Sequence, residues 1–162
     1  MNLEHFKSKS FKLKKENQLF LTKLKQQNPR KLDDAFHNSH NEVFEEVNCL
    51  TCANCCKTTS PIFRQKDIEV LSKKLKCTPS EFINNYLHLD SEGDFVLNSS
   101  PCPFLGQDNY CSVYEYRPTA CREYPHTDRK KMYQLIELTY KNTLVCPAVF
   151  EIVERLKKIK IK

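Results

Sequence analysis

Four cysteines fall within eight residues about one third of the way along the chain, and this cluster constrains the fold more than any other feature. They stand in the run Cys49-Leu-Thr-Cys52-Ala-Asn-Cys55-Cys56. A gap of two residues lets a tight turn aim two sulfurs at one ion, so zinc and iron–sulfur sites both use this spacing. Adjacent side chains diverge in an extended or turning backbone, so Cys55 and Cys56 are not expected to serve one ion equally. Eight residues cannot enclose an ion alone, which predicts further ligands elsewhere in the chain.

The chain has nine cysteines, and four of the remaining five are candidate ligands. Each of these four is flanked by a proline, an arginine or an aromatic residue that can hold a loop in place: Cys102, Cys111, Cys121 and Cys146. Together with the cluster they supply eight thiols, the number that two tetrahedral ions with all-thiolate shells require. Cys77 is set aside, because it follows an amphipathic segment where a small buried apolar residue is expected.

The rest of the sequence favours reduced thiols over disulfides. The first residues carry lysines and no apolar stretch longer than Leu19-Phe20-Leu21, so we see no secretory signal. No segment approaches the roughly 20 apolar residues of a membrane-spanning helix. We therefore expect a cytoplasmic protein without a membrane span, in which clustered cysteines indicate metal or redox chemistry.

Glycine content excludes several enzyme classes. The chain has only two glycines, whereas Rossmann and P-loop phosphate sites each need several in one turn. No pair of a nucleophile and a base is evident either, so the sequence favours a non-enzymatic role. An enzyme would need an open coordination position on a metal, or a partner subunit.

Positive charge is concentrated at the amino terminus. The formal net charge is +6, and the stretch from Lys7 to Lys31 holds nine basic residues against the single acid Glu16. This predicts a basic arm over residues 1–31, helical or frayed, followed by a cysteine-cluster domain over residues 32–162. A solvated helix face is the simpler interpretation of the arm. The alternative is an adaptor that binds a protein or, less favoured, nucleic acid through it.

Helix signals dominate the secondary structure. Asn28-Pro29 predicts a helix start, Thr78-Pro79-Ser80-Glu81 predicts a capping box, and Pro147 predicts the start of a last helix. The expected buried faces of the first and last of these helices are Leu32, Phe36, Val43 and Val47, and then Val149, Ile152, Val153, Leu156 and Ile159. Short strands are expected at residues 95–97, 110–114 and 132–139. We therefore predict a small, helix-dominated single domain of the α+β class, with short strands and with loops held together by bound metal.

The order and spacing of these residues resemble a known family. The motifs are Cys-x-x-Cys-x-x-Cys-Cys, then Cys102-Pro-Phe-Leu, then Cys111-Ser-Val-Tyr-Glu-Tyr-Arg117-Pro-x-x-Cys121-Arg122. Over residues 44–150 they resemble the YkgJ-type cysteine cluster family, described as zinc- or iron-chelating, some relatives of which are associated with methylation of flagellin lysines. The resemblance implies metal binding. Ala53 departs from it, because the family commonly has glycine there, and a positive φ would strain alanine.

Zinc is favoured over an iron–sulfur cluster. Four thiolates close a tetrahedral zinc shell, and the binding energy would support folding of a small domain. Iron, or an iron–sulfur cluster with a redox or methylation-associated role, is the alternative, since Cys49, Cys52 and Cys55 match the first three ligands of the bacterial ferredoxin run. Thr59 stands where a fourth ligand of that run is usual.

Other polar residues are assigned supporting or minor roles. Arg117 and Arg122 bracket Cys121, so their guanidinium groups are expected to offset thiolate charge and orient sulfur. Among the histidines, His126 is the best candidate to replace a thiol. His37 and His40 are three residues apart on a predicted helix, and solvent-exposed polar positions are the simpler interpretation of that pair.

Overall fold

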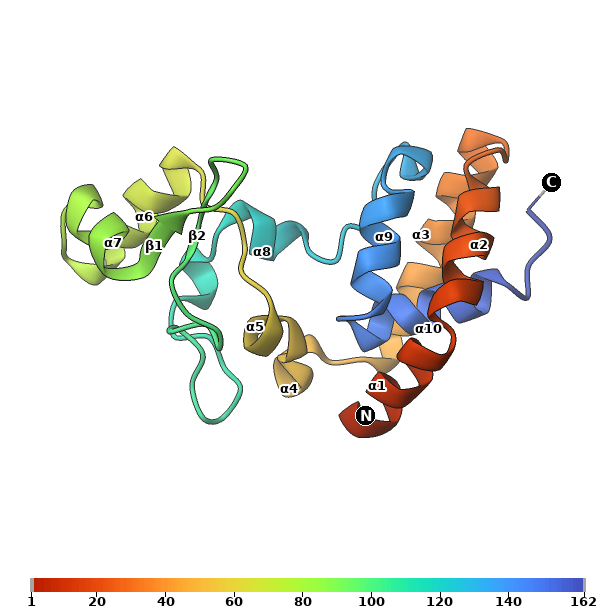
Figure 1. Cartoon of the computed structure of the whole chain (residues 1–162), viewed down its shortest axis with the longest axis horizontal. Helices are drawn as coiled ribbons and strands as arrows, with labels where there is room; N and C mark the ends of the chain where they lie inside the picture. The colour runs from red at the N-terminus through yellow and green to blue at the C-terminus, as the bar shows by residue number, and fades with distance from the viewer. Residues whose placement is uncertain (1, 162) are drawn as a thin grey trace. The chain divides into compact units, whose positions relative to one another are not determined.

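The contacts within the chain group its residues into two compact units. The structure is a computed structural model that describes residues 2–161 (Figure 1). Unit 1 comprises Met1–Asn48 and Pro125–Lys162, and unit 2 comprises Cys49–Tyr124. The predicted division into residues 1–31 and 32–162 stays a prediction. Its outermost residues, Met1 and Lys162, lie outside the described part.

Unit 1 is built from helices. Before the cysteine cluster it has α1 (Leu3–Lys12), α2 (Lys14–Leu24) and α3 (Pro29–Glu46); after unit 2 it has the 3₁₀ turn η2 (Met132–Gln134), α9 (Ile136–Thr143) and α10 (Pro147–Leu156). Helix α10 packs against α3 and α9, and α2 packs against α9. The turn η2 packs against α3. The fully buried side chains at these contacts include Leu21, Leu32, Phe36, Met132, Val149, Ile152 and Leu156.

The basic segment that the sequence leaves open as helical or frayed forms α1 and α2. Its buried face consists of Phe6, Ser10, Asn17, Leu21 and Leu24, at helical spacing. Two of these five residues are polar, so the apolar repeat looks irregular in the sequence although the helical stripe is continuous. Phe6 meets the Phe150 ring of α10 edge-on, with centroids 5.9 Å apart.

Capping residues start α3 and α10 where the sequence predicts. The Asn28 side chain accepts hydrogen bonds from the backbone N–H groups of Arg30 and Lys31, at 3.1 and 3.2 Å. Pro147 is the first residue of α10, as expected of a residue without a backbone donor. Two residues that are predicted to lie on buried helix faces do not do so. Val47 caps α3 and is half-buried, and Ile159 lies beyond α10 and is exposed.

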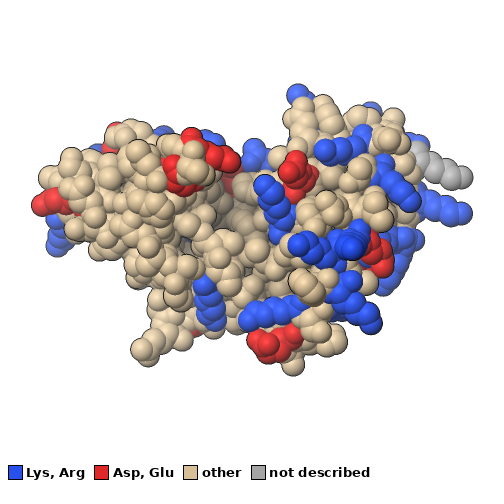
Figure 2. Space-filling view, viewed as in Figure 1, with Lys and Arg blue, Asp and Glu red and all other residues tan. Residues whose placement is uncertain are grey.

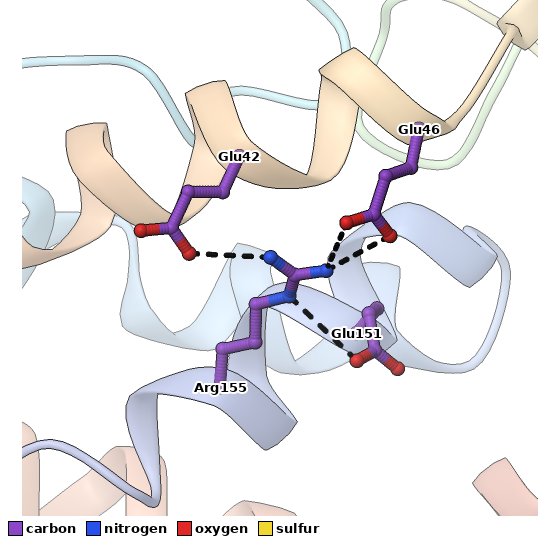
Figure 3. A network of polar contacts seen from close by, with 4 residues as sticks. All are labelled: Glu42, Glu46, Glu151 and Arg155. Carbon is purple, nitrogen blue, oxygen red and sulfur yellow. Dashed lines mark hydrogen bonds and ion pairs between the residues drawn. The ribbon is translucent and has the colours of Figure 1, made fainter.

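An ion-pair network ties α10 to α3 (Figure 3). The Arg155 guanidinium donates to Glu42 at 3.2 Å and to Glu46 at 3.0 Å, and its Nε lies 3.7 Å from Glu151. Glu42 and Glu46 are one turn apart on α3, so a single side chain spans both. The network links the two helices that carry most of the unit 1 core.

Unit 2 combines short helices with one hairpin. The elements are α4 (Cys49–Cys52), α5 (Asn54–Thr58), α6 (Gln65–Leu75), α7 (Pro79–Tyr86), β1 (Leu87–Leu89), β2 (Phe95–Leu97), η1 (Tyr114–Tyr116) and α8 (Thr119–Glu123). Strands β1 and β2 are antiparallel, with Leu87 opposite Leu97. The core contains Phe63, Ile68, Leu71, Phe82, Leu87, Leu97, Phe104 and Val113.

In unit 2, the predicted capping box and the predicted strand at residues 95–97 are confirmed. The strands predicted at residues 110–114, in unit 2, and at residues 132–139, in unit 1, are wrong. Thr78 Oγ1 accepts from the Glu81 N–H at 3.2 Å, and Glu81 accepts from the Thr78 N–H at 2.7 Å. Residues 110–114 contribute only a single bridge, between Cys111 and Leu105, before the 3₁₀ turn η1. Residues 132–139 form η2 and the start of α9, because the buried Met132, Ile136 and Thr139 recur every three to four residues.

The predicted class, a small helix-dominated α+β fold with short strands, is confirmed. In the part of the chain that the structure describes, no helix is both long enough and apolar enough to cross a bilayer.

Candidate metal centre

The first four cysteines lie on two short helices separated by a left-handed turn. Cys49 and Cys52 begin and end α4, and Cys55 and Cys56 lie in α5. Ala53 between the helices has φ +47° and ψ +18° and is buried. Its N–H donates to the Cys49 carbonyl at 3.0 Å, and its carbonyl accepts from the Lys57 N–H at 3.1 Å. Ala53 therefore adopts the positive φ that is expected to strain an alanine at this position.

The adjacent thiols of Cys55 and Cys56 lie side by side. Their Sγ atoms are 4.0 Å apart. Helical backbone in α5 brings together two side chains that an extended backbone would separate, which differs from the divergence expected from the sequence. The contact with the Cys55 thiol, the Cys56 backbone N–H and the Lys57 charge lower the pKa of Cys56 to about 7 against the opposing effect of burial. The Cys56 thiol is thus ionised near neutral pH more readily than an ordinary cysteine.

The loop that contains Cys102 is hydrogen-bonded directly to α5. The Cys102 N–H donates to the Cys56 carbonyl at 2.8 Å, and the Ser100 hydroxyl donates to the Lys57 carbonyl at 3.0 Å. The loop then turns back on itself, so that Leu105 and Cys111 form an antiparallel bridge. This pairing returns Cys111 to the neighbourhood of Cys102, nine positions earlier in the chain.

The third segment, α8, carries Cys121 and is anchored by a buried carboxylate. Asp67 Oδ1 accepts from both the N–H and the hydroxyl of Thr119, each at 3.0 Å, and Oδ2 accepts from the Arg64 N–H at 3.0 Å. Asp67 therefore caps α6 and holds the start of α8 with the same carboxylate. Sequence reasoning missed this role. The signal available was an aspartate at the third position of a helix, where it commonly caps.

Cys56, Cys102, Cys111 and Cys121 form one group of mutually close thiols. Burial raises the pKa of Cys102 and of Cys111, and raises that of Cys121 to about 12. The other thiols of the group add to these increases, because each of the four lies close enough to the other three for their charges to interact. Three separate segments of unit 2 thus converge on a single four-sulfur group.

Cys49 belongs to a second, more exposed group. Partial desolvation of its thiol raises the pKa of Cys49 although the residue as a whole is exposed, and the thiols of Cys52 and Cys56 raise it further. The Cys49 residue is exposed, and Cys52 and Cys55 are half-buried. Cys56 is the residue that the two groups share.

The donor set fits a thiophilic metal ion. Several thiols gathered in one place cannot all ionise without mutual repulsion, and a divalent cation removes that penalty. Across residues 2–161, no three His, Cys, Asp or Glu side chains form a ready-made ligand group. Ion binding would therefore require α5, α8 and the Cys102–Cys111 loop to bring these thiols closer together.

The two predicted arginines have different surroundings. The Arg117 guanidinium stacks 3.8 Å above the Tyr114 ring and donates to the Tyr114 carbonyl at 2.6 Å. Its positive charge offsets part of the increase in the pKa of Cys111 and of Cys121, so it lies near both thiols. Arg122 donates to the Arg117 carbonyl at 2.8 Å and to the Thr119 hydroxyl at 3.0 Å, which braces the turn into α8.

The remaining candidates lie elsewhere. Cys77 packs against the unit 2 core, as a small apolar residue would. Cys146 is the buried N-cap residue of α10 in unit 1. His126 also lies in unit 1, with Nδ1 3.5 Å from Arg129. Roles for Cys146 and His126 as ligands stay predictions.

The two helical histidines of unit 1 face the segment that follows residue 125. His37 Nδ1 contacts the Asp128 carboxylate, and His40 Nδ1 lies 2.9 Å from Thr127 Oγ1. These contacts join α3 to that segment within unit 1.

Comparison with known proteins identifies a family for this chain. Residues 48–147 match the model of the CxxCxxCC family, described as a putative zinc- or iron-chelating domain. The match covers more than half of the chain and confirms the resemblance drawn from the cysteine spacing. No curated protein and no solved structure matches the chain.

Proposed function

From the premise that this chain belongs to the CxxCxxCC family, we propose that it binds zinc through clustered cysteine thiolates. The observation that carries the proposal is the group formed by Cys56, Cys102, Cys111 and Cys121. Four thiolates satisfy the tetrahedral preference of Zn²⁺ and leave no open position for a substrate. A bound ion would cross-link α5, the loop after Cys102 and α8; neither α5 nor α8 has a buried apolar side chain of its own.

Metal analysis of anaerobically purified, reduced protein tests this proposal. The expected result is a colourless protein with stoichiometric zinc, in which Cys121→Ser lowers the zinc content and Cys77→Ser leaves it unchanged. Less than about a tenth of an ion per chain would contradict metal binding itself. A brown protein that absorbs near ~400 nm and contains iron and sulfide would replace zinc with an iron–sulfur cluster.

A second candidate function rests on how charge divides between the two units. Unit 1 carries eighteen Lys and Arg against eleven Asp and Glu, a formal net charge of +7, whereas unit 2 carries eight against nine. Figure 2 shows the basic side chains gathered over unit 1. Six exposed lysines of α1 and α2 make no ion pair within residues 2–161: Lys9, Lys12, Lys14, Lys15, Lys23 and Lys25. We propose on this basis that unit 1 binds an acidic partner while metal stabilises unit 2.

Charge reversal tests the adaptor function better than truncation. Deleting residues 1–31 would remove Phe6, Leu21 and Leu24 from the unit 1 core and unfold it. The triple variant Lys12→Glu, Lys14→Glu, Lys15→Glu alters only exposed positions. It should weaken salt-sensitive binding to polyglutamate or to a single-stranded oligonucleotide. Binding that is equally strong in the variant, or insensitive to salt, would contradict this function.

A further inference from the structure

We propose that Cys56 is a bridging ligand shared by two metal ions, so that seven thiols of unit 2 form a complete two-ion centre. The inference rests on the proposed metal-binding function and adds to it the division of ligands. One ion would be held by Cys56 with Cys102, Cys111 and Cys121. The other would be held by Cys56 with Cys49, Cys52 and Cys55.

The position of Cys56 supports this role. It lies in α5, the element that follows the α4 thiols and that accepts the backbone hydrogen bond from Cys102. Its charge reaches Cys49 on one side and Cys102, Cys111 and Cys121 on the other. Cys56 therefore interacts with thiols of both groups.

The contact between Cys55 and Cys56 has the dimension of a metal-centred tetrahedron. At a Zn–S bond length of about 2.3 Å, two sulfurs on one tetrahedral ion are about 3.8 Å apart. The 4.0 Å separation of the Cys55 and Cys56 sulfurs is close to that edge. The two adjacent thiols can therefore bind one ion together, although Cys56 also belongs to the four-thiol group.

The number of thiols in unit 2 agrees with one shared sulfur. Two separate tetrahedral ions need eight sulfurs, whereas two ions joined by one bridging sulfur need seven. Seven of the family-pattern cysteines lie in unit 2, and the eighth, Cys146, belongs to unit 1. A bridge makes the centre complete within one compact unit.

Charge also favours the bridged arrangement. Two divalent ions with seven thiolates carry a net charge of −3, compared with −4 for eight thiolates. Lys57 and Arg117 place positive charge close to Cys56 and Cys121 respectively, which offsets part of the remaining negative charge. The smaller excess lowers the cost of holding the centre in partly buried surroundings.

Titration of the metal-free, full-length chain with Co²⁺ tests the bridge. High-spin Co²⁺ gives sulfur-to-cobalt charge-transfer absorption and an electron paramagnetic resonance signal, and two Co²⁺ ions joined by a thiolate couple antiferromagnetically. We expect the absorption to saturate at about two ions per chain. The resonance intensity should grow up to the first equivalent and fall as the second is added.

Three substitutions sharpen the result. Cys146→Ser and the packing control Cys77→Ser should both keep two coupled ions. Cys56→Ser should abolish the coupling and reduce the capacity to one ion or none. If Cys56→Ser does not fold, the test of the bridge rests on two other measurements: the magnetic coupling in the unsubstituted chain and the number of ions bound by Cys146→Ser.

Two results would overturn the bridge while leaving metal binding intact. One is saturation at two ions whose resonance intensities simply add, and the other is a fall to one ion in Cys146→Ser. Failure of the proposed function looks different, because the chain would then give no charge-transfer absorption at any Co²⁺ concentration.

Discussion

Asp67 and Thr119, fifty-two residues apart in the chain, are joined by two hydrogen bonds of 3.0 Å to one carboxylate oxygen. The carboxylate is buried, and its second oxygen caps α6. Thr119 is the first residue of α8, two positions before Cys121. The placement of a candidate metal ligand thus depends on a side chain from a different helix.

Replacing Asp67 should therefore affect both folding and metal binding. We expect Asp67→Ala to lower the free energy of unfolding by about 2–3 kcal/mol, because three donors lose a charged acceptor. The Co²⁺ affinity should fall as well, since α8 is no longer held in place. Glu69→Ala, an exposed position on the same helix, is the matched control for chemical denaturation and Co²⁺ titration. Equal effects of the two substitutions would argue against the anchoring role of Asp67.

Ala53 offers a substitution that should stabilise the chain. Its φ of +47° lies in the left-handed region, where a side chain with a Cβ costs roughly 1–2 kcal/mol. We expect Ala53→Gly to raise the free energy of unfolding of the metal-free protein by about 1 kcal/mol, partly offset by the greater entropy of glycine when unfolded. Ala35→Gly, within α3, should instead lower it by about 0.5–1 kcal/mol. A destabilised Ala53→Gly variant would show that the turn gains more from the methyl group than it loses in strain.

Gly106 lies where the loop between Cys102 and Cys111 turns back. A Cβ built there would lie 2.5 Å from Asp108 Oδ1 and 3.3 Å from the Tyr110 carbonyl oxygen. That carbonyl accepts the Gly106 N–H at 2.8 Å, and Asp108 Oδ1 accepts the Tyr110 N–H at 3.0 Å. We expect Gly106→Ala to cost about 1–3 kcal/mol and to weaken Co²⁺ binding by displacing Cys111.

A second substitution separates the two contacts at Gly106. Adding Asp108→Ala to Gly106→Ala removes the closer clash and should recover part of the lost affinity in the same Co²⁺ titration. Asp108→Ala alone serves as the control, since it loses only the hydrogen bond to the Tyr110 N–H. No recovery in the double variant would assign the cost to the Tyr110 carbonyl.

Local signals explain which elements could be predicted from the sequence. The helix starts at Asn28, Thr78 and Pro147 each depend on residues within one turn, and all three are confirmed. The branched and aromatic residues of 132–139 predict a strand, but their buried positions follow the helical period. In α1 and α2 the buried face includes the polar residues Ser10 and Asn17, so the apolar residues alone do not show the helical period. The errors arise where tertiary burial outweighs local preference.

Long-range topology explains what could not be predicted about the site. The spacing of the cysteines along the chain identifies the candidate metal ligands and excludes Cys77, but it does not show which sulfur atoms are neighbours. The convergence of Cys56 with Cys121 depends on the Asp67 anchor and on the backbone bond from Cys102 to Cys56. The placement of Cys146 in unit 1 depends on the chain leaving that unit after Asn48 and returning at Pro125.

His40 makes the stability of unit 1 depend on pH. Partial burial lowers its pKa below the usual 6.5; the neighbouring Asp128 acts in the opposite direction, and His37 adds to the decrease. Its ring lies between Thr127, 2.9 Å from Nδ1, and the Phe44 ring, with centroids 4.4 Å apart. The hydration that the ring loses on burial lowers its pKa by more than the Asp128 carboxylate raises it.

The sign of the dependence follows from proton uptake. Below about pH 6.5 the unfolded chain binds a proton at this position more readily than the folded one, so protonation favours unfolding. The stability that neutral His40 permits is complete above that pH and is lost as the pH falls toward the lower pKa of the folded state. Denaturation midpoints should therefore decrease between about pH 7.5 and pH 5.5. His40→Gln should flatten this decrease, whereas His88→Gln, an exposed position in unit 2, should not. An unchanged slope in His40→Gln would contradict the assignment of this pH dependence to His40.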